Sequence, residues 1–208
     1  MSLEFGVLVL VILIFSAIFH EVAHGIVADR LGDPTARLLG RLTLNPIPHI
    51  DPIMSILLPL MLIFSGSPVI FGADKPVPVD PFNLRDGRRD MALVALAGPL
   101  TNVGIAILGA IVLHLFAGAL DTFFYFFILQ VVRLNLLLAI FNLIPIPPLD
   151  GSKVFSLILS EQQAGAYLSL GNMGIFILFA LLLIPIGGFS LGQIIFNLLE
   201  FSMHLLGL

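Results

Sequence analysis

The sequence contains no cysteine and carries little charge. Without cysteine the chain cannot form disulfides, thiolate metal sites or a cysteine nucleophile. Only 11% of its 208 residues are charged and 59% are hydrophobic, whereas a typical soluble domain is about 25% charged. Nine lysines and arginines and a net charge of −4 leave no basic patch for nucleic acid. The composition therefore predicts a polytopic membrane protein that forms one domain over residues 1–208.

Apolar runs long enough to cross a bilayer recur along the chain. A spanning helix needs about 20 mostly apolar residues, and five runs approach or exceed that length: Phe5–Val27, Met91–Ala119, Phe123–Ile144, Gly174–Ile186 with an amphipathic start at Glu161, and Phe189–Leu206. No basic residue precedes the first run, so we expect a permanent helix rather than a cleaved signal peptide. The predicted fold class is an all-α membrane protein with about five transmembrane helices.

A sixth run, Ile53–Phe71, is interrupted by Pro59 and by the sequence SGSP. Basic residues lie on both sides of it, and basic residues favour the cytoplasmic side of a membrane. A segment that enters and returns keeps both groups on one side, so we predict a re-entrant or short helix. The flanking segments 36–52 and 69–81 are rich in proline and partly alternating, which predicts a small β element at the membrane surface.

The sequence FHEVAH places two histidines and a glutamate within one helical turn of the first span. His20 and His24 are four residues apart, so their Cβ atoms lie on one face, about 5–6 Å apart. Two imidazoles at this spacing can share a zinc ion, and Glu21 can act on water without being a ligand. Ionisable groups inside a membrane helix indicate function.

A catalytic zinc usually has three protein ligands, and Asp150 is the best candidate for the third. It ends the sequence FNLIPIPPLDG, where three prolines stop a helix and Gly151 permits a sharp turn. The other histidines, His49, His114 and His204, suit interfacial or packed positions better than metal binding. Two further carboxylates lie in or beside apolar runs, Asp121 and Glu200, but neither stands out as a ligand as Asp150 does. An ordinary surface turn at Asp150 is the alternative.

The requirement that His24 and Asp150 bind the same metal ion also constrains the direction of the spans. His24 lies toward the end of the first span and Asp150 just after the end of the third, so both spans must run in the same direction for the two residues to meet. One full crossing between them satisfies this, whereas a second crossing at Ile53–Phe71 would not. We therefore expect the N-terminus outside and the site toward the cytoplasmic side.

These motifs together resemble the site-2 protease family of intramembrane zinc metalloproteases (peptidase M50). The resemblance rests on HExxH in a membrane helix, AGPLTN at 97–102 and NLIPIPPLDG at 142–151. It implies one zinc ion per chain bound by His20, His24 and Asp150, with Glu21 as the catalytic base. It further implies that Asn142 binds substrate and assists catalysis, and that Asn102 lies close to the site with a role in substrate binding.

The implied function is hydrolysis of peptide bonds in or near transmembrane helices of membrane-protein substrates. We expect a catalytic core at about 5–155, C-terminal helices at about 160–207, no PDZ or CBS domain, and a prokaryotic cell (inner) membrane location. The expected partners are then the lipid bilayer and a transmembrane protein substrate, and no nucleic acid. The sequence does not indicate the oligomeric state. The alternatives are a zinc-binding transporter and a non-proteolytic relative.

Arg133 lies in the middle of the third span, where a charge costs about 2.5–3.5 kcal/mol on insertion scales. It can pair with a carboxylate, either Asp121 or Glu200, or extend its long side chain to the interface. The sequence does not choose between these.

Overall fold

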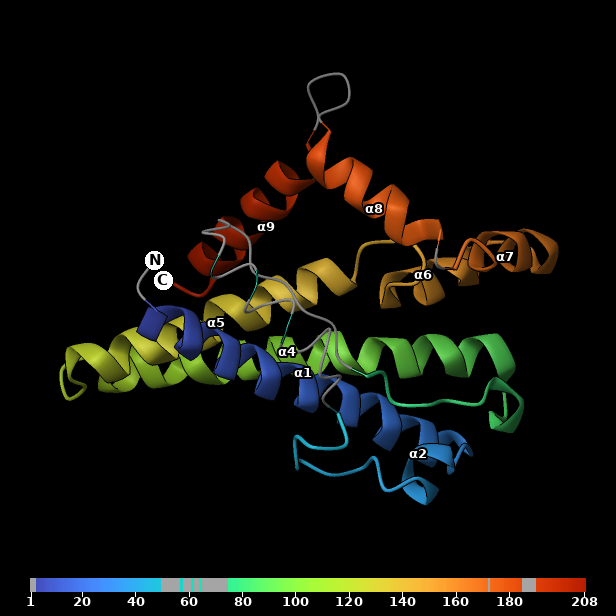
Figure 1. Cartoon of the computed structure of the whole chain (residues 1–208), viewed down its shortest axis with the longest axis horizontal. Coiled ribbons are helices and arrows are strands. Elements are labelled where there is room, and N and C mark those ends of the chain that lie inside the picture. Colours follow the sequence, from blue (N-terminus) through green and yellow to red (C-terminus); the bar gives the residue numbers. More distant parts are fainter. Residues whose placement is uncertain are drawn as a thin grey trace.

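The computed structural model describes residues 3–49, 57, 61, 64, 75–171, 173–184 and 190–208. Within these residues the regular elements are helical: α1 Leu3–Leu31, α2 Thr35–Leu38, η2 Pro81–Asn83, α4 Gly87–Phe116, α5 Thr122–Asn142, α6 Asp150–Phe155, η3 Ser156–Ile158, α7 Glu161–Leu168, α8 Met173–Leu183 and α9 Leu191–Leu205. Figure 1 shows α1, α4 and α5 stacked at the centre, with α8 and α9 forming an inverted V beside α5.

The three central helices form the membrane-spanning part. α1, α4 and α5 are each long and apolar enough to cross a membrane, which confirms the first three predicted spans. α4 packs against both of the others and runs in the opposite direction to them (Figure 1). The ends of α1 and α5 therefore lie at the same end of the bundle, as a shared metal site between them requires.

The fourth and fifth predicted spans are not continuous spanning helices in the described residues. The expected long fourth helix is divided into α7 and α8, which are bent by 72°. Gly171, in the turn after α7, has a φ of +39°, a left-handed conformation that glycine adopts without steric cost. α9 has 15 residues and is therefore about 22 Å long, shorter than a hydrocarbon core of about 30 Å. The structure thus supports three spans, or four if the bent pair crosses together.

The predicted re-entrant run 53–71 lies almost entirely outside the described residues. The neighbouring segments that are described, 36–49 and 75–80, contain α2, turns and irregular chain but no strand. One backbone hydrogen bond joins them, from Lys75 N to His49 O at 3.0 Å, and Arg41 Nη2 donates to Lys75 O at 2.6 Å. The predicted β element is therefore not confirmed, although the two segments do lie side by side.

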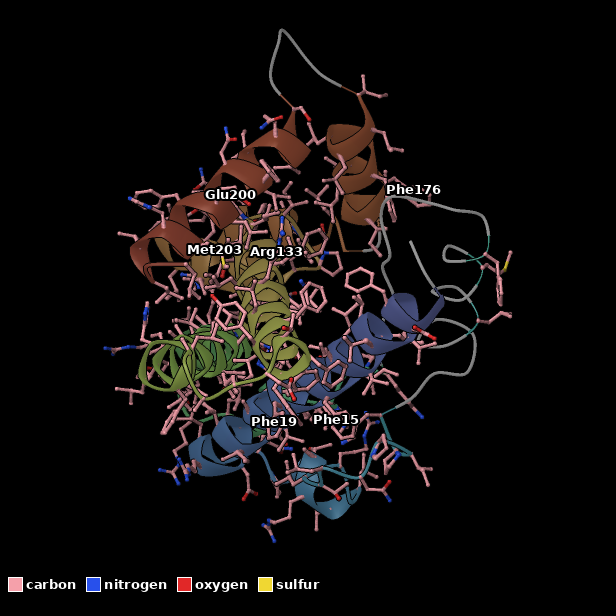
Figure 2. All side chains as sticks on the ribbon, turned by 90° about the vertical axis from the view of Figure 1, so that its left-hand side faces the viewer. Phe15, Phe19, Arg133, Phe176, Glu200 and Met203 are labelled. Carbon is pink, nitrogen blue, oxygen red and sulfur yellow. The ribbon has the colours of Figure 1, made fainter. Side chains whose placement is uncertain are left out.

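Arg133 pairs with Glu200, which answers the question that the sequence left open. The guanidinium Nη2 lies 3.5 Å from the carboxylate Oε1, and this pair joins α5 to α9 (Figure 2). Apolar side chains of α9, including Leu199 and Met203, pack into the same core as Val132 of α5. An ion pair and an apolar contact therefore hold α9 against the central bundle.

Asp33 connects the end of α1 to the segment that approaches η2. The side chain is fully buried and accepts hydrogen bonds from Thr35 N and Thr35 Oγ1, from Asp80 N at 2.7 Å and from Asn83 Nδ2 at 3.0 Å. Burial raises the pKa of Asp33, but the hydrogen bonds from Thr35, Asn83 and Asp80 outweigh it and lower the pKa below the ordinary carboxyl value. The carboxylate is therefore a structural anchor for residues 80–83.

Replacing Asp33 with alanine is expected to lower stability by about 2 kcal/mol near pH 7, because buried donors lose a charged acceptor. A lowered pKa in the folded state adds stability above the ordinary carboxyl pKa of about 4, and that contribution is lost as the pH falls through the folded-state pKa. The thermal midpoints of wild type and Asp33→Ala in detergent should therefore converge below about pH 4. A difference that stays constant with pH would contradict this role for the carboxylate.

Candidate metal site

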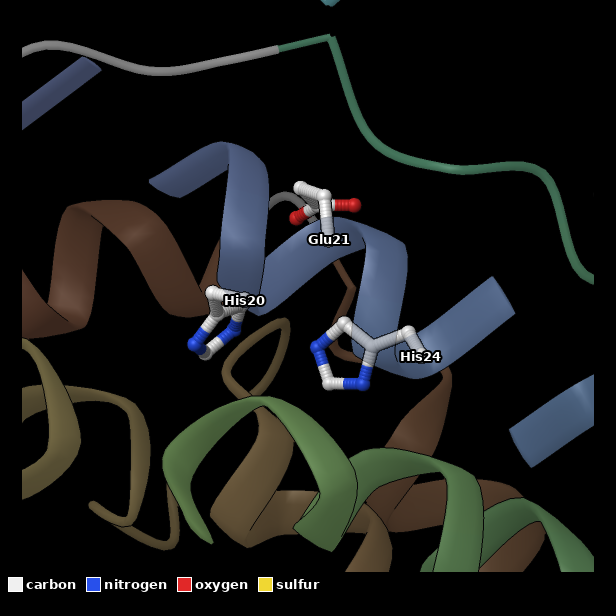
Figure 3. Close-up of side chains that lie close together, drawn as sticks. All are labelled: His20, Glu21 and His24. Carbon is white, nitrogen blue, oxygen red and sulfur yellow. The ribbon is translucent and has the colours of Figure 1, made fainter. Parts of the chain in front are cut away.

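The two histidines of the HExxH sequence point from α1 toward α4. Figure 3 shows both imidazole rings on this side of the helix and Glu21 on the other side. The ring centroids lie 4.6 Å apart, with the ring planes nearly perpendicular. Both residues are buried, so the spacing of four residues has placed two imidazoles on one covered face.

Asp150 completes a group of three donor atoms. Its Oδ2 lies 3.1 Å from His20 Nε2 and 3.1 Å from His24 Nε2, although it is 130 residues away from His20 in sequence. It is the first residue of α6. A Cβ on the next residue, Gly151, would lie 2.2 Å from Leu143 O, so only glycine lets α6 begin this close to the end of α5.

Hydrogen bonds determine which nitrogen of each histidine faces Asp150. His24 Nδ1 donates to the backbone oxygen of Val94 at 2.7 Å, and His20 Nδ1 donates to Asn102 Oδ1 at 2.8 Å. Because these oxygens only accept, each neutral ring carries its hydrogen on Nδ1 and has its lone pair on Nε2. Both lone pairs therefore face the position between the histidines and Asp150.

The geometry of this group fits a zinc ion. Zinc bonds of about 2.0–2.2 Å place neighbouring ligand atoms of a tetrahedron about 3.3–3.6 Å apart, close to the 3.1 Å separations of Asp150 Oδ2 from the two Nε2 atoms. Gly98 of α4 leaves the space open, since a Cβ there would lie 2.5 Å from His20 Nε2 and 2.6 Å from His24 Nε2. Two imidazoles and one carboxylate are also a usual donor set for catalytic zinc.

Glu21 lies next to this group but is held by a different segment. Its Oε2 accepts a hydrogen bond from Val77 N at 2.6 Å. A donor atom of Glu21 nevertheless lies within 4.8 Å of donor atoms of both histidines. Pro76 and Pro78 have no backbone N–H, so Val77 supplies the one amide donor of residues 76–78. The segment thus orients the carboxylate beside the metal position.

A cavity of about 450 Å³ opens onto these residues. His20, Glu21, His24, Asn142 and Asp150 all contribute to its lining, as do Pro76, Val77 and Val79. Asn142 Nδ2 donates to Leu138 O at 3.0 Å, which uses one of the two hydrogens of its amide group. The cavity therefore brings five of the six predicted site residues together.

Asn102 is the sixth predicted residue, and it lies behind His20 rather than in the lining of this cavity. It is fully buried, with Oδ1 on His20 and Nδ2 donating to Asn135 Oδ1 at 3.1 Å. Sequence reasoning missed Asn135, although a buried amide in the middle of an apolar span is itself a functional signal. The contacts of Asn102 favour a role in supporting His20 over contact with substrate.

Lys153 is a second residue that sequence reasoning missed. It follows Asp150 by less than one helical turn, and its Nζ donates to Asp150 Oδ1 at 3.1 Å and to Pro148 O at 3.0 Å. Lys153 thus engages one oxygen of Asp150 while the other faces the histidines.

Comparison with known proteins gives a consistent picture. The model of peptidase family M50 matches residues 114–185. The chain is 35% identical to YwhC of Bacillus subtilis over 190 residues, covering 86% of this chain and 81% of that protein. It is 34% identical to Rip2 of Mycobacterium tuberculosis over 148 residues, covering 70% of this chain and 56% of Rip2. The names of both relatives class them with the zinc metalloproteases. No solved structure matches the chain.

Proposed function

Since this chain belongs to peptidase family M50 and is a zinc metalloprotease of the membrane, we propose that it cleaves peptide bonds in or near the transmembrane helices of membrane-protein substrates. The observation that carries this proposal is the position of the site. His20, Glu21 and His24 belong to a helix that is apolar and long enough to span a membrane, so their chemistry is available to peptide that is itself embedded in lipid.

The residues have separate roles in this proposal. His20, His24 and Asp150 hold one zinc ion per chain. When bound, zinc supplies a Lewis acid that makes water a nucleophile near neutral pH. Glu21 accepts the proton of the attacking water and transfers it to the leaving amine, with its carboxylate oriented by Val77 N. Asn142 donates its second amide hydrogen to the peptide oxygen as negative charge develops there.

A substrate helix has to unwind before it can react, because its carbonyl groups are engaged in its own hydrogen bonds. Residues 76–79 belong to no helix, and Pro76, Val77 and Val79 line the cavity. Such a segment can pair with an unwound peptide through backbone groups. We propose that it receives the substrate beside Glu21.

The proposed orientation follows from the distribution of basic residues. Arg30, Arg37, Arg85, Arg88 and Arg89 all lie near the end of α1 or the start of α4, which is the end of the bundle nearest the histidines. Because basic residues favour the cytoplasmic side, we place the N-terminus outside and the site toward the cytoplasm of a prokaryotic cell.

The proposal is tested by incubating the purified protein with a model transmembrane substrate. We expect cleavage to stop after treatment with a chelator and to return after addition of zinc. In this mechanism only the bound metal supplies the Lewis acid that the reaction requires. Substrate lengths on a gel and cut positions by mass spectrometry provide the readout. Cleavage that persists without metal would contradict the metalloprotease mechanism. Zinc flux into vesicles without any cleavage would instead favour a transporter.

A further inference from the structure

A chain of hydrogen bonds buried between the three central helices leads away from His20. Asn102 of α4 accepts from His20 Nδ1 and donates through Nδ2 to Asn135 of α5. Asn135 Nδ2 donates to Ser16 Oγ of α1 at 2.9 Å and to the backbone oxygen of Val131 at 2.8 Å. Asn102 and Asn135 are fully buried and Ser16 is 4% exposed, so water does not substitute for any of these partners.

The direction of this chain is determined at its far end. The backbone oxygen of Val131 can only accept a hydrogen bond, so the nitrogen end of the Asn135 amide has to face it. The oxygen end of Asn135 then faces Asn102 and requires the nitrogen end of that amide. Asn102 consequently presents its oxygen to His20, and only a ring with hydrogen on Nδ1 satisfies that oxygen.

From this order we propose that Asn135 is a positioning residue for the metal site, acting through Asn102 on His20. The inference rests on the proposed zinc site, which it deepens. In His24 the backbone oxygen of Val94 directly fixes the ring hydrogen on Nδ1. In His20 the same tautomer depends on the side-chain amides of Asn102 and Asn135, which are oriented in turn by the Val131 carbonyl. Partners of metal-binding histidines that fix ring orientation in this way are known to change metal affinity by about 10- to 100-fold when replaced.

Replacement of Asn135 with leucine removes the acceptor that orients Asn102. The Asn102 amide can then rotate and offer its nitrogen to His20 Nδ1, which accepts it only with the ring hydrogen on Nε2. That form cannot bind zinc through Nε2. We expect the zinc Kd to rise about 10-fold, measured in detergent by competition with a chromophoric chelator. Asn197→Leu is the matched control, because Asn197 is exposed on α9 and bonds to Gln193.

A rescue variant separates positioning from helix packing. Aspartate at position 102 accepts from His20 Nδ1 in either rotation, so it does not need Asn135 for orientation. Asn102→Asp combined with Asn135→Leu should therefore recover zinc affinity to within about threefold of wild type. A role of Asn135 in packing alone predicts no recovery, since the second substitution restores no contact to α5.

The outcomes distinguish failure of the proposed zinc site from failure of the proposed role of Asn135. Wild-type protein that binds no zinc would overturn the zinc site itself. Asn135→Leu with the affinity of Asn197→Leu, or a double variant no better than Asn135→Leu, would overturn only the role of Asn135. If Asn135→Leu does not fold, Asn102→Asp and Asn102→Leu are compared. Tighter zinc binding by the aspartate variant supports the hydrogen-bond chain, and equal binding overturns it.

Discussion

Glu21→Gln is expected to lose cleavage by about 10²- to 10⁴-fold, the usual contribution of a positioned acid–base group, while zinc remains bound. Glutamine has the same shape and can still accept the hydrogen bond from Val77 N, but its amide does not take a proton from water. His20, His24 and Asp150 are untouched, so metal content should equal that of wild type. Cleavage rate and bound zinc per chain are measured on the same preparation.

A second glutamate on the same helix provides the control. Glu4 lies in the first turn of α1, is exposed and is four turns from the site, so Glu4→Gln should cleave at the wild-type rate. If Glu21→Gln retained its cleavage rate, another group would have to serve as the base. If it lost zinc as well, Glu21 would belong to the ligand set instead.

Gly98→Ala should weaken zinc binding, because the added methyl group occupies the space between α4 and the two histidine rings. Its Cβ would lie 2.5–2.6 Å from both Nε2 atoms, where ordinary carbon contacts are about 3.5–4.0 Å. Forcing extra volume into a packed site costs about 1–3 kcal/mol, so we expect the zinc Kd to rise by about 5- to 150-fold. Titration with a competing chelator gives the Kd.

Gly104→Ala is the matched substitution on the same helix. A Cβ at Gly104 meets no atom within 4 Å, so this variant should keep wild-type zinc affinity. It should also unfold at a slightly higher temperature, because alanine favours a helix over glycine by about 0.5–1 kcal/mol. Equal zinc affinity in the two variants would mean that the metal does not lie against α4.

The proposed donor set is predicted from the sequence because it depends on local features. The spacing of His20 and His24 places them on one helical face whatever the helix packs against. Asp150 stood out because prolines end the preceding helix and Gly151 permits the turn. The common direction of the first and third spans then followed from requiring these residues to meet, and the structure places Asp150 Oδ2 3.1 Å from both rings.

The supporting residues depend on features that the sequence does not contain. Asn135 contacts Asn102 only for one rotation of α5 about its axis, and that rotation is decided by packing of the whole bundle. The bend between α7 and α8 was not predicted, because the amphipathic segment that starts at Glu161 leads directly into the apolar residues 174–186. The proposed β element is not confirmed, since the described residues 36–49 contain part of α2 and turns rather than a strand.

The pairing of Arg133 with Glu200 has a consequence for how the protein is made. Ribosomes add about 5–20 residues per second, so α5 emerges several seconds before α9 exists. During that interval the arginine has no carboxylate from α9, and a lone arginine at mid-membrane costs about 2.5–3.5 kcal/mol. Docking of α9 therefore gives the α5 arginine a carboxylate partner that it lacks during that interval.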